Sequence, residues 1–358
     1  MLRPVAEAET VVPDEITYRT RGAVAECVLS SDAIVVTGRH PSVRSRIIDR
    51  ILSLPLSDEA GSMLCALLVG HTDLITDGRR EEFSAAGLSH LLALSGLHVG
   101  VISMLISVAL WPLYVGRHNR SRHIITIAAL WAFAAMTEFS PSVTRAVIMA
   151  SVYLVGRIIE RQSVPMNSLF FAAMIILCIW PDSLFEIGFQ LSFAAVAGII
   201  LFYPLINCVD RRKHPWMYML ISYPAVSLSA MVFTGPVSSF YFHSYPLYFL
   251  LANLAVSPLV PLLIAAGALA VILSFAGFQV TWLCSAADWL CGAVNGIASF
   301  VASLPGHSAV GLYFSHWILC GIIISLLFLA LGGWRRRIAP LIIGFGCMVL
   351  TAEVHALI

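Results

Sequence analysis

The chain has 358 residues, of which 59% are hydrophobic and 11% charged, and its formal net charge is +1. A soluble domain is nearer a quarter charged, and a soluble protein of this length could not bury so much apolar surface. The composition therefore excludes a soluble fold, and the balanced charge excludes a general basic field for binding nucleic acid.

The first part of the chain has the only β-like pattern. Short runs such as Ile16-Thr17-Tyr18 and Ala33-Ile34-Val35-Val36 are separated by turn residues. They are too few to close a barrel or a sandwich, so we interpret residues 1–40 as the remnant of a β-domain. No long apolar core precedes them, which argues against a cleavable signal peptide.

The next segment, 41–87, changes to a helical period. Residues 41–55 place their isoleucines and leucines on one face, with Arg44, Arg46 and Arg50 elsewhere. Such an amphipathic helix can lie on a membrane surface, and packing against the protein itself is an equally good interpretation. A second short helix is expected at 58–69.

From residue 88 to residue 358 the chain is hydrophobic and forms the expected transmembrane domain. About 20 apolar residues cross the hydrocarbon core, so the pattern predicts roughly ten transmembrane helices. The fold class is thus an all-α polytopic membrane protein with a small N-terminal β/α remnant. The expected spans are 88–113, 122–139, 142–159, 166–180, 184–206, 216–235, 246–275, 280–304, 309–331 and 338–357.

The charges of the loops predict the topology. Arginine and lysine occur in alternate loops, and the loops between them carry neither residue. By the positive-inside rule the basic loops lie in the cytoplasm, which puts both termini outside. The basic loops are 116–122, 156–162, 207–214 and 333–337.

Polar residues in the first span mark the strongest candidate site. His90 and His98 are eight residues apart, which places them two turns apart on roughly the same side, and Ser95-Gly96 between them favours a kink. Ionisable side chains at membrane depth usually face a cavity or a partner. Neutral imidazoles that only bond neighbouring helices are an alternative of about equal weight.

Other spans contribute further polar side chains. Arg145 lies one turn into the third span, where it could meet a phosphate or form a structural pair with Glu138 or Glu186. The region that carries Asn253 is interrupted by prolines, and broken helices of this kind often mark a substrate path. The predicted translocation path consists of His90, Ser95, His98, Arg145, Glu186, Gln190, Asn253, Asp288 and Asn295.

The cysteines and histidines form no pattern typical of a metal site. No C-x-x-C pair occurs among the 8 cysteines, and the 11 histidines are scattered. A hydrolase that uses Ser95 and His98 would lack an acidic orienting group and an oxyanion hole. The sequence therefore predicts no metal, no cofactor and no enzymatic activity.

A series of motifs along the chain resembles the ComEC competence family. The most specific is the run Gly87 to Gly100, which contains Ser-His-Leu-Leu-Ala-Leu-Ser-Gly-Leu-His-Val-Gly. The similarity covers about residues 41–310. The other matching segments are Leu68-Val69-Gly70, Ser140-Pro141-Ser142 with Arg145-Ala146, Gly188 to Phe193, Thr234-Gly235-Pro236, Asn253 to Pro261, and Leu304-Pro305.

This resemblance implies a channel in the bacterial inner membrane through which single-stranded DNA enters the cytoplasm during transformation. Full members also carry an oligonucleotide-binding-like β-domain and a metallo-β-lactamase-like nuclease domain. The chain resembles a shortened member, in which the first is reduced to the segment 1–40 and the second is missing. The resemblance then implies a separate nuclease and a separate DNA-receptor protein as partners, and a homo-oligomer is possible.

Two alternatives to the DNA channel follow from the same residues. The first is a transporter of a smaller anion or metabolite that uses the same broken-helix site. An inactive, truncated homologue is the other alternative, because both accessory domains are reduced or missing.

Overall fold

The computed structural model describes residues 2–4, 15–18, 25–30, 42–111, 119–159, 164–207, 209, 213–278, 280–305, 308–310 and 316–335. The chain divides into two compact units, residues 1–43 and 44–358. The expected span at 338–357 lies outside the described residues.

The first unit contains a small antiparallel sheet. Strands β1 (Leu2–Pro4) and β2 (Glu15–Tyr18) both pair with β3 (Ala25–Ser30), in the order β1-β3-β2. Strand β2 coincides with one of the β-like runs in the sequence. The run at 33–36 lies outside the described residues, and the sequence pattern did not predict β1 and β3.

In the described part of the second unit, the chain is helical apart from its loops and one short antiparallel ribbon, in which β4 (Ser244–Pro246) pairs with β5 (Ser308–Val310). Its helices follow the apolar segments of the sequence closely. They are α1 (Val43–Leu52), α2 (Asp58–Val69), α3 (Asp77–Ala85), α4 (Ser89–Leu92), α5 (Gly96–Ala109), α7 (Asn119–Met136), α8 (Pro141–Ile158), α9 (Pro165–Ile179), η3 (Pro181–Phe185), α10 (Ile187–Ile206), α11 (Pro215–Phe242), α12 (Phe249–Val256), α13 (Leu259–Phe275), α14 (Thr281–Ala302) and α15 (His316–Arg335).

Three helical segments of the described chain are long and apolar enough to cross a bilayer: Ile187–Ile206, Pro215–Phe242 and Phe249–Phe275. Shorter apolar helices lie at Gly96–Ala109, Pro165–Ile179 and Trp317–Leu331. An integral membrane protein built of helices is therefore the fold class that the structure supports.

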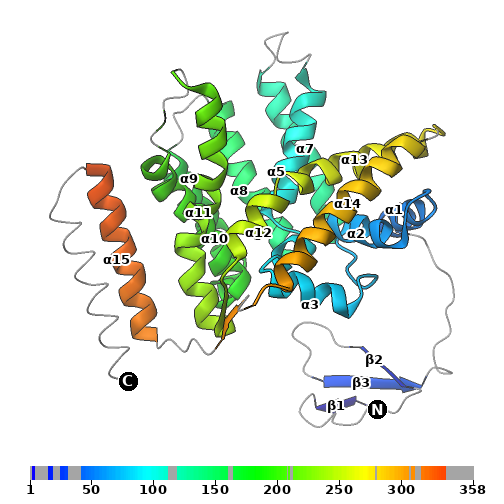
Figure 1. Ribbon diagram of the computed structural model, residues 1–358, viewed down its shortest axis with the longest axis horizontal. Helices are drawn as coiled ribbons and strands as arrows, with labels where there is room; N and C mark the ends of the chain where they lie inside the picture. Colours follow the sequence, from blue (N-terminus) through cyan, green and yellow to red (C-terminus); the bar gives the residue numbers. More distant parts are fainter. Residues whose placement is uncertain are drawn as a thin grey trace. The chain divides into compact units, whose positions relative to one another are not determined.

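Figure 1 shows how the helices are arranged in the second unit. Helices α8, α9, α10 and α11 run side by side, and α5 packs against α7, α8 and α13. Helices α13 and α14 lie across the unit and hold α2 and α3 against it. The largest buried cluster joins α2, α13 and α14, with Leu64, Leu263 and Ile264 fully buried.

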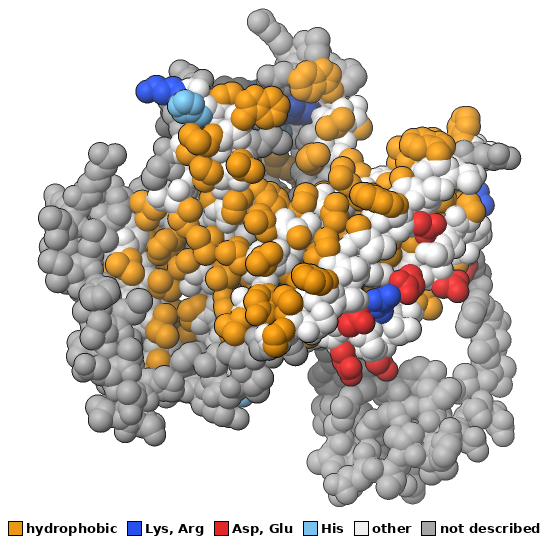
Figure 2. Space-filling view, in the orientation of Figure 1, with side chains coloured by type: hydrophobic (Ala, Val, Ile, Leu, Met, Phe, Trp, Pro, Cys, Tyr) orange, Lys and Arg blue, Asp and Glu red, His pale blue; other side chains and the backbone are white. Residues whose placement is uncertain are grey.

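Hydrophobic side chains also cover much of the outer face (Figure 2). Trp216, Leu220, Trp289 and Trp317 are at least 69% exposed, although each is large and apolar. Exposed apolar area on this scale marks a surface that contacts another apolar phase, here the lipid of a membrane. Acidic side chains gather instead around a basic one, at the part of this face where α2, α3 and α14 lie (Figure 2).

Helices α11 and α3 differ from the sequence prediction. Helix α11 continues to Phe242 instead of ending near 235, with Pro224 and Pro236 inside it. A proline removes only one backbone hydrogen bond, and continuing the helix satisfies the other amides where water is excluded. Helix α3 was missed because its polar sequence, Asp77 to Ala85, lacks an apolar period.

Candidate functional site

The first expected span is broken in its middle. Helix α4 ends at Leu92, Ala93 and Ser95 have extended backbones, and α5 starts at Gly96. Leu94 turns back onto Gly70, the left-handed residue that ends α2, and a Cβ at Gly70 would lie 2.6 Å from the Leu94 side chain. This contact explains why a glycine is needed at Gly70.

The His98 side chain hydrogen-bonds the residue that precedes α5. Its Nδ1 accepts a hydrogen bond from the Ser95 amide at 3.1 Å and lies 3.0 Å from the Ser95 hydroxyl. The His98 side chain is fully buried, and its Nε2 has no hydrogen-bond partner. Since Nδ1 accepts, the neutral ring carries its proton on Nε2, which leaves a buried donor unsatisfied.

The second broken helix packs against the first. Between α12 and α13 the chain turns at Ser257 and Pro258, and Asn253 precedes this break by one turn. The Asn253 amide donates to Ser227 Oγ at 3.0 Å, and its Oδ1 accepts from Ser257 at 2.9 Å. The His90 ring lies 5.7 Å from the ring of Phe249 on α12. The structure thus places α4 beside the start of α12, and α5 also packs against α13.

Arg145 lies where α8 meets α10. Its side chain is only 9% exposed, and its Nη1 lies 3.6 Å from Glu186 Oε2. A Cβ on Gly188 would lie 2.8 Å from Arg145 Nη2, so only a glycine lets the guanidinium rest against the first turn of α10. At 3.6 Å the ion pair is longer than a charge-assisted hydrogen bond, which is about 2.7–2.9 Å. Glu138 pairs instead with Arg44, at 2.8 Å.

Gln190 ties α10 to its neighbours. Its Nε2 donates to the Leu184 carbonyl at 3.0 Å, and its Oε1 accepts from the Tyr241 hydroxyl of α11 at 2.9 Å. Both functional groups of the Gln190 side chain are therefore engaged.

The last two predicted residues, Asp288 and Asn295, lie on α14 and face α2. Asp288 Oδ1 accepts from the amide and the hydroxyl of Ser57, at 3.0 and 2.8 Å, where α2 begins. Asn295 donates to Glu59 Oε2 at 2.9 Å. The structure therefore places Asn295 in a second polar group, while Asp288 binds the start of α2.

Arg79 is the centre of this second group, which we call the Arg79 network (Glu59, Arg79, Glu82, Asn295 and Ser299). Its guanidinium binds both Glu59 oxygens, at 2.9 and 3.1 Å, and Glu82 Oε2 at 2.8 Å. Glu82 also accepts from Ser299 at 2.6 Å. Sequence reasoning missed Glu59, Arg79 and Glu82, although the i, i+3 spacing of Arg79 and Glu82 is typical of a helical ion pair.

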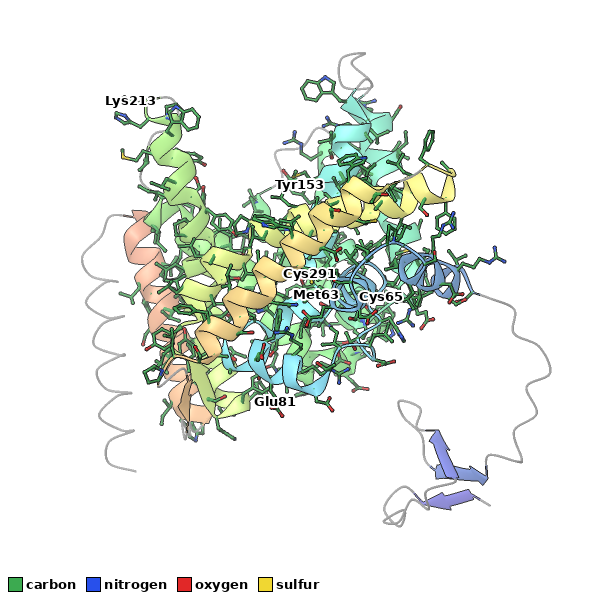
Figure 3. The ribbon with its side chains drawn as sticks, turned by 45° about the vertical axis from the view of Figure 1, so that its right-hand side comes forward. Met63, Cys65, Glu81, Tyr153, Lys213 and Cys291 are labelled. Carbon is green, nitrogen blue, oxygen red and sulfur yellow. The ribbon has the colours of Figure 1, made fainter. Side chains whose placement is uncertain are left out.

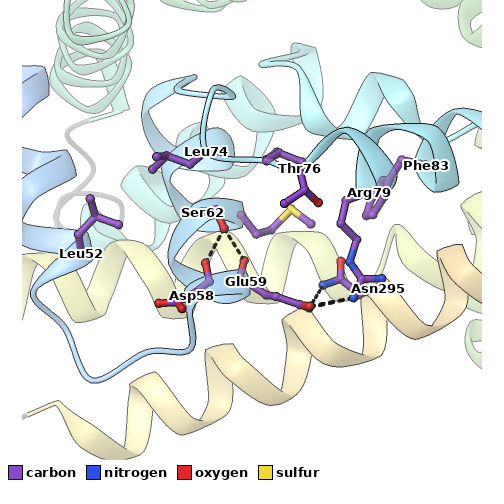
Figure 4. A pocket seen from close by; sticks show the side chains of 11 residues that line it. Leu52, Asp58, Glu59, Ser62, Leu74, Thr76, Arg79, Phe83 and Asn295 are labelled. Carbon is purple, nitrogen blue, oxygen red and sulfur yellow. Dashed lines mark hydrogen bonds and ion pairs between the residues drawn. The ribbon is translucent and has the colours of Figure 1, made fainter.

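These contacts also change the acidity of the two carboxyl groups. The hydrogen bond from Arg79 lowers the pKa of Glu59, with Asn295 adding to the effect. Hydrogen bonds from Ser299 and Arg79 lower the pKa of Glu82. The network borders a pocket of about 320 Å³ between α2, α3 and α14 (Figure 4).

Two arginines of α1 also bind the protein itself. Arg44 contacts the Gly70 carbonyl at 3.3 Å, in addition to Glu138, and Arg50 donates to the Ser274 carbonyl at the end of α13. The guanidinium of Arg50 also lies 5.2 Å from the centre of the Phe275 ring. Cations at helix C-termini complement the carbonyls that the helix leaves free.

Within the described residues, no group of three or more histidine, cysteine, aspartate or glutamate side chains is placed to hold a metal ion. A family model described as Competence protein matches residues 67–336, which is most of the chain and includes every predicted site residue. The chain belongs to the Competence protein family. This membership and the apolar helices together fit an inner-membrane protein of competence.

Relatives of this chain include ComE operon protein 3 of Bacillus subtilis (strain 168). It is 28% identical over 319 residues, which are 86% of this chain and 39% of the relative. The uncharacterized protein YcaI of Escherichia coli (strain K12) is 26% identical over 50% of this chain and 25% of its own length. An uncharacterized protein of Aquifex aeolicus (strain VF5) is 30% identical over 33% of this chain and 27% of its own length.

The chain thus spans about two fifths of the length of its Bacillus relative and about a quarter of the length of the other two. No solved structure gives a significant match.

Proposed function

We propose that this chain is the core of a membrane channel that carries single-stranded DNA into the cytoplasm during natural transformation. Membership of the Competence protein family and the similarity to ComE operon protein 3 support a role in DNA uptake. The observation that carries the proposal is the packing of two broken helices against each other: the His90 ring of α4 lies beside Phe249 of α12, and α5 packs against α13.

A break in a helix at membrane depth is tolerated only where protein groups or a water-filled cavity supply hydrogen bonds to the freed backbone amides and carbonyls. We assign the path to the residues at and beside these breaks and exclude the pair that binds α2. The proposed path residues are His90, Ser95, His98, Arg145, Glu186, Gln190 and Asn253. Asp288 and Asn295, which were predicted as path residues, hold α2 against α14 in this proposal.

The proposed topology has about ten spans in the inner membrane, with both termini outside. Figure 3 shows Lys213, from a basic loop, and Glu81, from α3, at opposite ends of the helical unit. That separation suits a cytoplasmic side at Lys213 and an outer side at Glu81. Single-cysteine variants in the four basic loops should resist a thiol reagent added from outside, and efficient labelling of two or more would contradict the topology.

The proposal assigns the chain a transport role without catalysis. Degradation of the second strand would then be carried out by a nuclease, and capture of duplex DNA by a receptor, as separate parts of the uptake apparatus. Purified protein incubated with duplex DNA and manganese or zinc should leave the DNA intact. Cleavage that survives repurification and disappears in His71→Ala would contradict this assignment.

Direct flux measurement tests the function itself. Proteoliposomes that contain the purified chain should admit a short single-stranded oligonucleotide and exclude duplex DNA. Rapid uptake of small anions without oligonucleotide uptake would instead support the alternative of a metabolite or anion transporter.

A further inference from the structure

A group of neutral polar side chains lies where α12 ends and α13 begins. The Asn253 amide donates to Ser227 Oγ on α11 at 3.0 Å, and its Oδ1 accepts from Ser257 at 2.9 Å. Tyr223 lies one turn before Ser227 on α11, and its hydroxyl faces Ser257. The His90 ring lies beside Asn253 from the side of α4. We call these five residues the Asn253 cluster.

A glycine allows the start of α4 to approach α12 closely. Gly87 has a φ of 76°, and a Cβ there would lie 2.7 Å from Pro246 and 3.0 Å from Phe249. The His90 ring then lies 5.7 Å from the Phe249 ring, at an interplanar angle of 56°. His90 remains exposed in this arrangement, so the Asn253 cluster and the His90–Phe249 ring pair can be reached from the side of α4.

The Tyr223 hydroxyl is the part of the cluster that the fold leaves unused. It is buried and has no hydrogen-bond partner. The other two tyrosines of α11 are paired, Tyr218 with Tyr203 at 3.0 Å and Tyr241 with Gln190 at 2.9 Å. Because buried polar groups are almost always paired, the Tyr223 hydroxyl needs an explanation. It is available to a ligand that is absent from the structure.

The chemistry of the Asn253 cluster suits a nucleobase better than a phosphate. None of its five side chains is an arginine, a lysine or a carboxylate. A phosphate is bound by cations and backbone amides, and its charge would be costly beside neutral side chains at membrane depth. Amides and hydroxyls instead bond the edges of unpaired bases, and aromatic rings pack on their faces. The cluster offers the polar groups of Asn253 and Tyr223, and the ring pair beside it offers aromatic faces.

We propose that the Asn253 cluster contacts the bases of the translocated strand, with the Tyr223 hydroxyl bonding base edges and the His90–Phe249 ring pair packing on base faces. This inference rests on the function proposed above, and it adds Tyr223 and Ser227 of α11 to the path. Pairing hides the edges of bases in a duplex, and stacking hides their faces. The cluster therefore selects a single strand over a duplex.

A strand that lacks bases separates base contacts from backbone contacts. The full chain is reconstituted in phosphatidylcholine nanodiscs, and anisotropy measures the binding of a fluorescent oligothymidylate and of an abasic strand of the same length. The wild type should bind the oligothymidylate more tightly. Tyr223→Phe keeps the ring and removes only the hydroxyl. It should weaken oligothymidylate binding about fivefold, as expected for one lost hydrogen bond, and leave the binding of the abasic strand unchanged.

Tyr218→Phe is the matched control, because Tyr218 is also half-buried on α11 and its hydroxyl is already paired with Tyr203. This variant should bind both strands like the wild type. Since the Tyr223 hydroxyl has no partner in the fold, its removal should leave the midpoint of thermal unfolding no lower than that of the wild type.

Two kinds of result would overturn the base contacts. Tyr223→Phe could weaken both strands equally, which would show a structural role, or it could change the binding of neither. Equal binding of the two strands by the wild type would also overturn the inference, while oligonucleotide uptake into proteoliposomes would leave the proposed function intact. If the wild type neither binds nor admits any oligonucleotide, the proposed function is contradicted, and the base contacts with it.

Discussion

The two polar groups of the helical unit differ in how completely they are paired. In the Arg79 network, the guanidinium has three carboxylate contacts between 2.8 and 3.1 Å, and Glu82 has Ser299 as a second donor. Elsewhere in the unit, the buried Nε2 of His98 on α5 and the buried hydroxyl of Thr144 on α8 lack hydrogen-bond partners.

This difference separates a structural group from a binding group. Buried polar atoms are almost always paired, so unpaired donors need an explanation. The Arg79 network satisfies its charges internally and has little to offer a ligand. His98 Nε2 and the Thr144 hydroxyl are buried without a partner, which costs stability unless another group binds them.

Substitutions of Arg145 and Arg79 should show the largest difference in transformation efficiency. Arg145→Lys keeps the charge but loses the planar fork, so we expect transformation to fall about tenfold while membrane abundance stays normal. Arg79→Lys should leave transformation near the wild-type value. Loss of abundance in parallel with loss of transformation in Arg145→Lys would show that Arg145 serves the fold through Glu186.

Gly188 offers a way to move Arg145 without changing it. The methyl group of Gly188→Ala would lie 2.8 Å from the flexible end of the arginine, so the guanidinium must shift while the helices keep their packing. We expect oligonucleotide affinity to fall about threefold, or ~0.7 kcal/mol. Gly296→Ala on α14 is the control, because nothing lies within 4 Å of a Cβ there. Equal affinities in the two variants would contradict the placement of Arg145 in the proposed path.

The sequence predicts the positions of the helices better than it predicts which helices pack against one another. Apolar runs located the long segments, and Pro258 located the break between α12 and α13. The pattern also placed Asp288 and Asn295 two turns apart on one face, as the structure has them. It could not show that this face contacts Ser57 and Glu59, more than 200 residues earlier. Periodicity predicts which residues share a helix face, but it does not predict which other helix packs against that face.

The contacts of Arg145 were only partly predictable. The spacing suggested Glu138 or Glu186 as partners, and the structure pairs Arg145 with Glu186 and Glu138 with Arg44. The contact between Gly188 and the guanidinium depends on how α8 packs against α10, which no local pattern encodes. The free hydroxyl of Thr144 likewise becomes visible only once its surroundings are known.

Arg79→Ala should weaken the fold instead of transport. It leaves Glu59 and Glu82 close together without their shared cation. These groups are partly exposed and screened by solvent, so the loss in the free energy of unfolding should be about 1 kcal/mol. Thermal unfolding in nanodiscs would measure it, and an unchanged midpoint would show that the network contributes nothing to stability.

The contribution of the Arg79 network to the free energy of unfolding should depend weakly on pH, and its direction of change can be predicted. The folded-state pKa values of Glu59 and Glu82 lie below the ordinary value of 4.5. A lowered carboxyl pKa contributes stability above the unfolded value, and that stability is lost as the pH falls through the folded value. The stability difference between the wild type and Glu59→Gln should therefore be present at pH 7 and shrink below about pH 4.5. A difference that grows on acidification would contradict the network, and Glu81→Gln serves as the exposed control.

Protection of two engineered cysteines would test the central claim most directly. Ser95→Cys places a thiol at the break between α4 and α5, and Ser299→Cys places one in the Arg79 network. Both serines are half-buried, so in a cysteine-free background the two thiols are comparable targets for a small thiol reagent. If DNA passes the broken helices, a single-stranded oligonucleotide should slow modification at position 95 and leave position 299 unaffected. Equal protection at both positions, or protection at position 299 alone, would contradict the account.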